Sequence, residues 1–311
     1  MPPSDSGRPD QDTVPLPVGT SSAVGRRVGL VVQDRYRLVA VRGHGGVGEV
    51  YEADDLRTGR KVAVKTMLPW AQRSPEVVRR FEREARAGNA LDHPNIVDVS
   101  DMGNLDDGSL FLVMELVRGV DVADLLEHGQ LAPRRALAIA RQTLTGLAYA
   151  HGRGFVHRDL KPANLMIVRA GDDEVVKILD LGLVKLIGEA AEELGGDKLT
   201  ATGAIFGTPV YMSPEQALGR PLDARTDLYT MGVILFEMLT GKVPFRGTDP
   251  MATLRLHTST PPPTMASRAP GAAWITPELE AVVARALAKQ AADRFASADE
   301  MRAALDAAAP L

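Results

Sequence analysis

The stretch of sequence that decides the fold reads His157-Arg158-Asp159-Leu160-Lys161-Pro162-Ala163-Asn164, and the run Asp180-Leu181-Gly182 follows it at the end of an apolar segment. Together they hold two acids, one amide and one ammonium group at fixed spacing. This set suits phosphoryl transfer, because an acid accepts the hydroxyl proton, oxygen ligands hold magnesium and a cation follows the migrating group. A solvated polar loop would explain any single member, so only the whole string favours a catalytic site.

A glycine-rich segment lies upstream and reads Gly43-His44-Gly45-Gly46-Val47-Gly48-Glu49-Val50. Its first six residues also fit a turn that binds dinucleotides, but such a turn must open a helix. Here the segment leads into Val50-Tyr51, which is typical of a strand. We therefore expect the tip of a hairpin, where backbone N–H groups approach phosphates, with an ordinary glycine-rich turn as the alternative.

The next expected strand, Val62–Lys65, places a small residue and a lysine on one face. Its two-residue period places Ala63 and Lys65 on the same face. The small Ala63 would leave room for a flat base, and Lys65 could reach the phosphates. In the helix that follows, Glu84 falls on an apolar stripe near Phe81. Because an unpaired buried carboxylate is costly, Lys65 is its expected partner. A solvated Lys65 and a rim position for Glu84 are the alternatives.

The chain divides into a sheet-rich part and a helix-rich part. Residues 1–33 are expected to form a disordered arm, because proline, glycine and serine are frequent there without periodicity. Strand patterns occupy much of the next 80 or so residues, and helical patterns dominate beyond Gly119, which indicates two lobes of an α+β fold. The expected strands are 36–41, 49–52, 61–67, 97–101, 110–114 and 175–179, and the expected helices after Gly119 are 133–151, 226–239, 277–289 and 297–308.

These motifs, in this order, resemble the eukaryotic-type (Hanks-type) protein kinase family, in its bacterial serine/threonine branch. Lys161 and the run Gly207-Thr208-Pro209-Val210-Tyr211 resemble serine/threonine kinases more than tyrosine kinases. The resemblance implies a bilobal protein-kinase-like α+β fold, with a small antiparallel β-sheet N-lobe that carries one main helix and a larger, mainly helical C-lobe. The implied kinase domain covers residues 34–308, with the N-lobe at 34–114, the hinge at 115–117 and the C-lobe at 118–308.

The resemblance assigns the chemical roles residue by residue. Asp159 would orient the acceptor hydroxyl and take its proton, while Lys161 would stabilise the γ-phosphoryl group. Asn164 and Asp180 resemble the ligands of Mg²⁺, for which Mn²⁺ could substitute. The acid Asp227 resembles the residue that anchors the backbone of the catalytic loop.

The resemblance also predicts an ATP site between the lobes. Lys65, paired with Glu84, would contact the α- and β-phosphates. Met114 resembles the gatekeeper, and the hinge Glu115–Val117 would hydrogen-bond adenine. The remaining nucleotide contacts would come from the glycine segment and the walls of the site: Arg42, Gly43, His44, Gly45, Gly46, Val47, Gly48, Val50, Ala63, Glu115, Val117 and Met166.

The chain departs from the family pattern at three positions. Leu181 replaces the usual phenylalanine of a hydrophobic stack, and Gly88 replaces a larger apolar residue. Arg42 stands where the family has a leucine above adenine, and its methylene stem is expected to cover the ring. None of the three removes a catalytic group. Elsewhere the pattern holds, and Glu215 of Ser213-Pro214-Glu215 is expected to pair with Arg294.

The long segment after the Asp-Leu-Gly motif is expected to regulate the site. We expect autophosphorylation at Thr200, at Thr202 or at both, although a solvated loop residue is an equally good interpretation of each. A phosphothreonine carries about −1.5 to −2 charges and orders a loop where basic groups surround it. Thr208 is instead expected to position the substrate by bonding the catalytic acid and lysine. The basic residues expected to meet the phosphate are Arg80, Arg158 and Lys185.

Composition narrows the remaining classes of function. The chain of 311 residues has no cysteine, 40 acidic and 36 basic side chains and a formal net charge of −4. The lack of cysteine excludes disulfides, cysteine-ligated zinc and thiol catalysis, and the mixed charges argue against a nucleic-acid partner. Because no apolar run approaches the roughly 20 residues of a membrane span and no signal peptide is visible, we expect a cytoplasmic protein.

The expected function is that of a serine/threonine protein kinase, which uses ATP to phosphorylate protein substrates and forms a transient homodimer for trans-autophosphorylation. A pseudokinase that serves as a scaffold or binding module is one alternative, and the intact catalytic set argues against it. A small-molecule kinase of similar fold is another. Gly207–Tyr211 and Ser213–Glu215 disfavour it, because they look like a peptide-docking segment. The chain is expected to be either a whole soluble kinase or a catalytic fragment of a longer protein.

Overall fold

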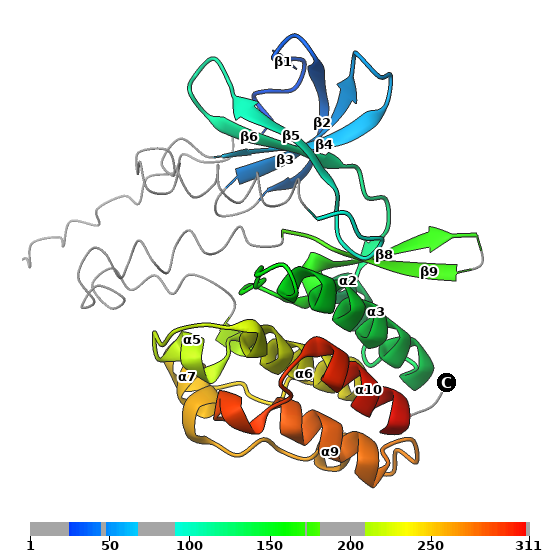
Figure 1. The fold of residues 1–311 in the computed structure, drawn as a ribbon, viewed down its shortest axis with the longest axis vertical. Coiled ribbons are helices and arrows are strands. Elements are labelled where there is room, and N and C mark those ends of the chain that lie inside the picture. Colours follow the sequence, from blue (N-terminus) through cyan, green and yellow to red (C-terminus); the bar gives the residue numbers. More distant parts are fainter. Residues whose placement is uncertain (1–24, 45–47, 68–90, 172, 181–208, 309–311) are drawn as a thin grey trace, which may run out of the picture.

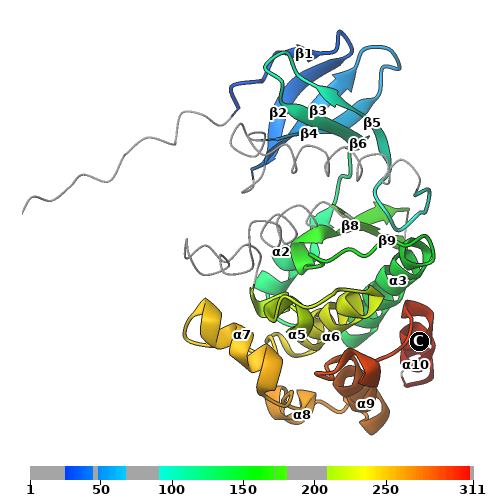
Figure 2. The same ribbon diagram turned by 60° about the vertical axis from the view of Figure 1, so that its left-hand side comes forward.

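The computed structural model describes residues 25–44, 48–67, 91–171, 173–180 and 209–308. A six-stranded sheet in the order β1-β2-β3-β4-β6-β5 forms one end of the molecule, and a helical layer forms the other (Figure 1). A three-stranded sheet, β7-β8-β9, lies on the side of the helical layer that faces the larger sheet (Figures 1 and 2). The predicted α+β fold with two lobes is therefore confirmed.

Every pairing in the N-lobe sheet is antiparallel, including that of β4 with β6, which are not consecutive strands. The strands have two packed faces, because Ala63 of β4 joins one apolar cluster and its neighbour Val64 joins another. The sheet therefore buries apolar side chains on both of its faces. The strands are β1 (Val31–Val32), β2 (Tyr36–His44), β3 (Gly48–Asp55), β4 (Lys61–Met67), β5 (Val99–Asn104) and β6 (Leu110–Glu115).

The expected disordered arm, residues 1–33, is too long, because residues 25–33 pack on the N-lobe. The Gly29 N–H donates to the carbonyl of Leu38 at 2.8 Å, and the Leu38 N–H donates back to Leu30 at 2.9 Å. Arg27 donates to the hydroxyl of Thr66 at 2.9 Å. Backbone pairing and one partly buried guanidinium hold this segment, and neither produces a hydrophobic period in the sequence. Residues 1–24 of the expected arm lie outside the described residues.

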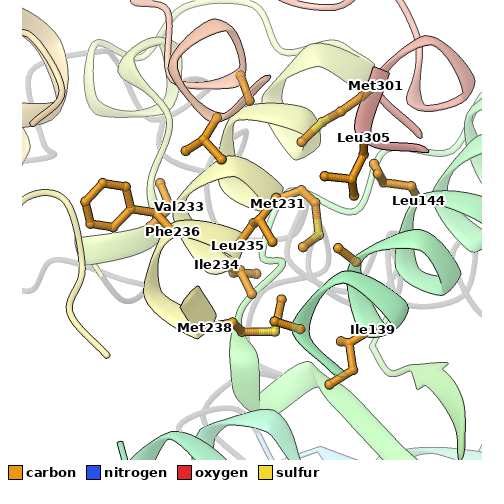
Figure 3. Packing of buried hydrophobic residues seen from close by; sticks show 14 of the residues in the cluster. Ile139, Leu144, Met231, Val233, Ile234, Leu235, Phe236, Met238, Met301 and Leu305 are labelled. Carbon is orange, nitrogen blue, oxygen red and sulfur yellow. The ribbon is translucent and has the colours of Figure 1, made fainter. Parts of the chain in front are cut away.

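The helical layer is built around α6, Ala224–Thr240. All of its residues except Ala224, Arg225 and Glu237 are buried. Its apolar side chains pack with those of α3 and α10 (Figure 3). Asp223 caps its N-terminus, and Gly241 ends it at a φ of 68°, where a Cβ would be strained. The C-lobe elements are β7 (Val120–Asp121), α2 (Val122–Glu127), α3 (Pro133–His151), β8 (Leu165–Ala170), β9 (Asp173–Ile178), α5 (Pro214–Ala217), α6, α7 (Pro250–Ser259), α8 (Met265–Arg268), α9 (Pro277–Ala286) and α10 (Ala298–Ala308), with 3-10 turns at Pro162–Asn164, Pro209–Tyr211 and Ala291–Asp293.

Among the described residues, no helix is long and apolar enough to cross a membrane.

The bounds predicted for the longer helices and strands come close to the observed ones, and α3 matches its expected range from Pro133 to His151. The short elements β1, α2, β7, β8, α5, α7 and α8 were missed, because runs of two to ten residues give a weak periodic signal.

Candidate active site

The loop His157–Asn164 is fixed from below by one buried carboxylate. Asp227 of α6 is 1% exposed, and its two oxygens accept from the backbone N–H groups of His157 and Arg158, each at 2.8 Å. His151 at the end of α3 donates to the same carboxylate at 2.8 Å. Burial raises the pKa of Asp227, but the hydrogen bond from His151 and the nearby imidazoles outweigh burial and hold the pKa below its ordinary value.

Backbone strain in the loop falls on Arg158, whose φ of 66° is in the left-handed region. The Asp227 bond on its N–H side and a bond at 2.6 Å from the Gln216 amide to its carbonyl hold it there. The side chain of His157 is fully buried and donates to the carbonyl of Leu179 at 2.9 Å. This bond ties the loop to the residue before Asp180. The predicted anchoring role of Asp227 therefore matches its geometry.

Asp159, Lys161 and Asn164 converge at the top of this loop. The Lys161 ammonium lies 2.7 Å from Oδ2 of Asp159. The side-chain amide of Asn164 donates to the backbone carbonyl of Asp159 at 2.8 Å, which leaves its amide oxygen as the ligand atom for a cation. A carboxylate placed at this point of the loop can accept a proton from a hydroxyl group, and the ammonium group beside it can contact a phosphoryl oxygen.

The second acid, Asp180, meets the N-lobe. Oδ1 of Asp180 lies 2.7 Å from the ammonium of Lys65 on β4, so the two expected phosphate and metal contacts are brought together across the lobes. Burial raises the pKa of Asp180, but the charge and hydrogen bond of Lys65 outweigh it and keep the pKa below its usual value. Asp180 itself has a φ of 53°, a conformation that this ion pair helps to hold. The expected partner of Lys65, Glu84, lies outside the described residues.

The described residues fit a divalent cation of the magnesium type. Asn164 and Asp180 offer one amide and one carboxylate oxygen, and Mg²⁺ commonly binds through one or two protein oxygens while water and phosphate fill the rest. No group of three or more His, Cys, Asp or Glu side chains that could hold a metal occurs among the described residues. A dedicated all-protein cage of the zinc or calcium kind therefore finds no support in that part of the chain.

The residues expected around adenine gather on one side of the sheet. Ala63 pairs with Met114 across β4 and β6, and Val50 and Val117 pack against the same cluster. Met166 lies on β8 opposite Lys177 and is half-buried. No group among the described residues accepts a hydrogen bond from the Val117 N–H, which leaves it free for an acceptor on a flat base.

The hinge residue Glu115 is held by groups from both lobes. Its N–H donates to the carbonyl of Asp98 at 2.9 Å, and its carboxylate lies 2.6 Å from the ammonium of Lys177 on β9. The Asp98 N–H also donates to this carboxylate at 3.1 Å. Lys177 was not singled out from the sequence, because nothing in a strand pattern marks an ion pair with a residue 62 positions away.

The hairpin that carries the glycine segment is observed between β2 and β3, with Gly43 opposite Val50 and His44 opposite Glu49. A Cβ on Gly48 would lie 2.2 Å from the carbonyl oxygen of Thr66, so only glycine fits there. The described parts of the segment thus lie on two paired antiparallel strands, as the sequence predicts.

An acid that the sequence motifs did not indicate lies on β3, the second strand of this hairpin. Glu52 is opposite Ala63 and on its face of the sheet, and it is 5% exposed. Arg42 donates to it from Nε at 3.0 Å, and Arg118 and Lys61 each approach it to 3.5 Å. The hydrogen bond from Arg42 holds the pKa of Glu52 below its ordinary value. Arg42 is thereby fixed, with more than half of its side chain exposed.

Behind the expected peptide-docking segment, a buried ion pair joins α5 to the C-terminal part of the chain. Arg294 donates to both oxygens of Glu215, at 2.7 and 2.8 Å, and its side chain is fully buried. Thr226 donates to the same carboxylate at 2.9 Å. The pairing expected from Glu215 and Arg294 is therefore present. Several other sequence predictions lie outside the described residues: Gly45, Gly46, Val47, Arg80, Glu84, Gly88, Leu181, Lys185, Thr200, Thr202 and Thr208.

Comparison with known proteins agrees with this geometry. Residues 36–304 match the protein kinase domain family. The chain is 40% identical over 282 residues to the serine/threonine-protein kinase pkn3 of Myxococcus xanthus, covering 90% of this chain and 51% of that protein. It is 42% identical over 278 residues to the serine/threonine-protein kinase PknB of Mycolicibacterium smegmatis, covering 88% of this chain and 43% of that protein. The chain thus spans about half the length, or less, of these curated relatives.

A solved structure gives the same result for the fold. The crystal structure of the PknI kinase domain of Mycobacterium tuberculosis superposes on this chain with a TM-score of 0.70 at 28% sequence identity. The match covers 91% of this chain and 99% of that one. The similarity therefore extends over both lobes.

Proposed function

The chain belongs to the protein kinase family, and we propose that it transfers the γ-phosphoryl group of ATP to serine and threonine hydroxyls of protein substrates. The observation that carries the proposal is the pair of charged contacts, Lys161 with Asp159 and Lys65 with Asp180, each at 2.7 Å, around one anchored loop. The names of the curated relatives support the choice of serine and threonine as acceptors.

The mechanism follows from what these side chains can do. Asp159 accepts a hydrogen bond from the acceptor hydroxyl, aims its oxygen at the γ-phosphorus and takes its proton as the new P–O bond forms. Lys161 stays with the phosphoryl oxygens and offsets their charge while the bond to ADP breaks. Lys65 holds the α- and β-phosphates. A divalent cation, Mg²⁺ or Mn²⁺, held by Asn164 and Asp180, would supply charge neutralisation between the phosphates when bound.

The nucleotide is proposed to lie between the cluster around Ala63 and Met114 above and Met166 below. The N–H of Val117, which no described residue accepts from, gives adenine a donor at the hinge. Arg42, fixed by Glu52, covers the outer edge of the base with its methylene stem. The backbone N–H groups of the glycine hairpin meet the phosphates.

We also propose the domain limits and setting of this activity. The N-lobe runs to residue 114, the hinge covers 115–117 and the C-lobe covers 118–308. Because ATP and Mg²⁺ are abundant in the cytoplasm, the domain is proposed to work there on protein substrates.

Transient pairing of two copies would allow phosphorylation of Thr200 or Thr202 in trans. Three basic residues, Arg80, Arg158 and Lys185, would surround the phosphate, and Thr208 would lie beside the substrate. Mass spectrometry after incubation with ATP and Mg²⁺ tests this, and an unmodified loop in active enzyme contradicts it.

Phosphate transfer from γ-labelled ATP to dephosphorylated casein tests the function itself. We expect Asp159→Asn to lower the rate by about 100-fold or more, because a positioned general base contributes about 10²–10⁴-fold. Asp306→Asn is the matched control, since this acid is half-exposed and pairs with Arg141 far from the loop. Equal transfer by the wild type and Asp159→Asn, or none by either, would overturn the proposal.

A further inference from the structure

The segment that precedes β1 lies against the N-lobe sheet. The family match begins at residue 36, so residues 25–30, which we call the N-terminal strap, lie before the matched part. Two backbone hydrogen bonds hold the strap to β2, from Gly29 to the carbonyl of Leu38 at 2.8 Å and from Leu38 to the carbonyl of Leu30 at 2.9 Å. The strap continues into β1, which pairs with β2. It therefore has a fixed course along the sheet.

The side chain of Arg27 anchors the strap to three groups of the sheet. Its guanidinium donates to the hydroxyl of Thr66 on β4 and to that of Ser109, each at 2.9 Å, and lies 2.8 Å from a carboxylate oxygen of Asp107. The Arg27 side chain is 14% exposed, and Thr66 and Ser109 are buried. One cation thus joins the end of β4 to the turn between β5 and β6, through hydrogen bonds that water cannot easily replace.

The strap also touches the glycine hairpin itself. A Cβ on Gly25 would lie 3.4 Å from Cγ2 of Val41 on β2, and the Gly25 N–H donates to Oε1 of Glu49 on β3 at 3.4 Å. Glu49 is 6% exposed, and the hydroxyl of Tyr51 donates to its other oxygen. Nδ1 of His44, on the facing strand, lies 3.5 Å from Oε1 of Glu49. One buried carboxylate therefore contacts the strap and both strands of the hairpin.

Each of these contacts lies one residue along the chain from a residue that the proposed function assigns to ATP. The three pairs of neighbours are Val41 with Arg42, Glu49 with Val50, and Thr66 with Lys65. Successive side chains of a strand point to opposite faces of the sheet. Accordingly, Val41 packs on the apolar cluster of one face, and Val50 packs on the cluster of the other, which contains Ala63. The strap thus lies behind the residues that are proposed to meet the nucleotide.

We propose that the N-terminal strap, anchored by Arg27, positions the nucleotide site by holding the backbone of β2, β3 and β4 from their outer face. The proposal rests on the proposed function, because that function assigns the opposite face to ATP. Arg27 is a positioning residue, since its side chain lies on the outer face and acts on the nucleotide only through the strands. Its nearest link to the site is Thr66, next to Lys65, so it governs the affinity for the phosphates more than that for the base.

Calorimetric titration of the full chain tests the proposal with two probes, adenosine and the non-hydrolysable ATP analogue AMP-PNP with Mg²⁺. We expect Arg27→Met to weaken the binding of AMP-PNP about three- to tenfold, the range that loss of a buried hydrogen bond gives, with adenosine within about twofold of the wild type. Arg27→Lys keeps the charge and has three donors, so its affinity for AMP-PNP should lie closer to that of the wild type. In phosphate transfer, Arg27→Met should raise the KM for ATP and leave kcat unchanged.

Arg35→Met is the matched control. Arg35 belongs to the same lobe, its side chain is 25% exposed, and it lies 2.8 Å from Asp55 and 3.0 Å from Asp101. Asp55 is the last residue of β3, at the end of that strand away from the glycine hairpin. The control therefore reports any general loss of N-lobe stability. The proposal is overturned if the two variants weaken AMP-PNP binding equally, if Arg27→Met does not weaken it, or if adenosine binding falls as much.

Hydrogen exchange without nucleotide separates this proposal from the function. Exchange of the backbone amides at residues 48–52 of β3 should quicken in Arg27→Met and stay unchanged in Arg35→Met. If exchange and AMP-PNP binding change as expected while the wild type transfers no phosphate, the positioning role stands and the proposed function fails. If the wild type transfers phosphate while Arg27→Met changes neither exchange nor AMP-PNP binding, the positioning role fails and the function stands. A wild type that binds no AMP-PNP would overturn both.

Discussion

One carboxylate fixes the catalytic loop, His157–Asn164, and another fixes Arg42, which forms the roof of the proposed nucleotide site. The two carboxylates lie in different surroundings. Asp227 is 1% exposed and holds two backbone N–H groups and an imidazole, all at 2.8 Å. Glu52 instead binds the tips of long side chains, and those of Arg42 and Arg118 are 57% and 69% exposed. Buried bonds to backbone fix a geometry, whereas exposed ion pairs contribute little and are screened by salt. The chemistry is thus built on a rigid part, and the nucleotide meets an adjustable one.

The largest effect is expected from removing the buried anchor. Asp227→Ala leaves two backbone N–H groups and His151 without their charged acceptor, so we expect a loss of about 3–5 kcal/mol in the free energy of unfolding. Chemical denaturation measures it. Asp306→Ala, which removes a half-exposed acid that pairs with Arg141, should cost less than about 1 kcal/mol. Similar losses in the two variants would show that Asp227 is not a special anchor.

The same anchor predicts a dependence on pH. The pKa of Asp227 is lowered in the folded protein from an ordinary value of 3.8, so the unfolded chain binds its proton first as the pH falls. The stabilisation by Asp227 is therefore complete above about pH 5 and is lost as the pH falls through 3.8 toward the folded pKa. The difference in stability between the wild type and Asp227→Ala should shrink in acid. A constant difference from about pH 7 to about pH 3 would contradict this.

A smaller effect is expected at the buried ion pair of Glu215 and Arg294, behind the expected peptide-docking segment. Arg294→Met leaves Glu215 buried without its cation, which should cost about 3 kcal/mol in unfolding free energy. Arg302→Met removes an arginine that is 40% exposed and pairs with Asp299, and it should cost less than about 0.5 kcal/mol. Thermal unfolding of both variants measures the contrast. Equal shifts would mean that burial does not separate the two kinds of pair.

The smallest effect is expected at the roof. Glu52→Gln and Arg42→Leu should each raise the KM for ATP by about two- to fivefold and leave unfolding nearly unchanged, because the partners are exposed. If the two residues act through each other, the double variant should match the larger single effect. The effect of Glu52→Gln should also fade between low and high salt. Additive, salt-independent effects would show that Arg42 reaches the nucleotide without Glu52.

The sequence predicted the rigid region better than the adjustable one. Pro133–His151 has a clear period and a proline at its first helical position, so both ends of α3 were predicted. The motif around Asp159 places its groups within a few residues, and local spacing is what a sequence shows directly. The anchor Asp227 was assigned by resemblance, and α6 stood out because it is apolar on every side.

The interactions that were missed join residues on different strands or segments of the chain. Glu52 meets Arg42 across a hairpin and Arg118 from beyond the hinge, and neither strand pattern marks a charged partner. Lys177 reaches Glu115 in the same way. Residues 25–33 pack through backbone bonds and Arg27, for which low hydrophobicity gives no signal. Tertiary ion pairs need coordinates, because their partners are chosen by the fold and not by spacing.

One measurement tests most directly whether the rigid region serves the chemical step and the adjustable region serves nucleotide binding. Asp227→Asn and Glu52→Gln make the same chemical change, a carboxylate to an amide, in the rigid and in the adjustable region. Steady-state phosphorylation of casein with ATP as the varied substrate should show kcat lowered at least about tenfold in Asp227→Asn, with the KM for ATP within about twofold. Glu52→Gln should show the KM for ATP raised with kcat unchanged. If both variants lower kcat alike, or both raise the KM for ATP alike, the two carboxylates have the same role in catalysis and the account is wrong.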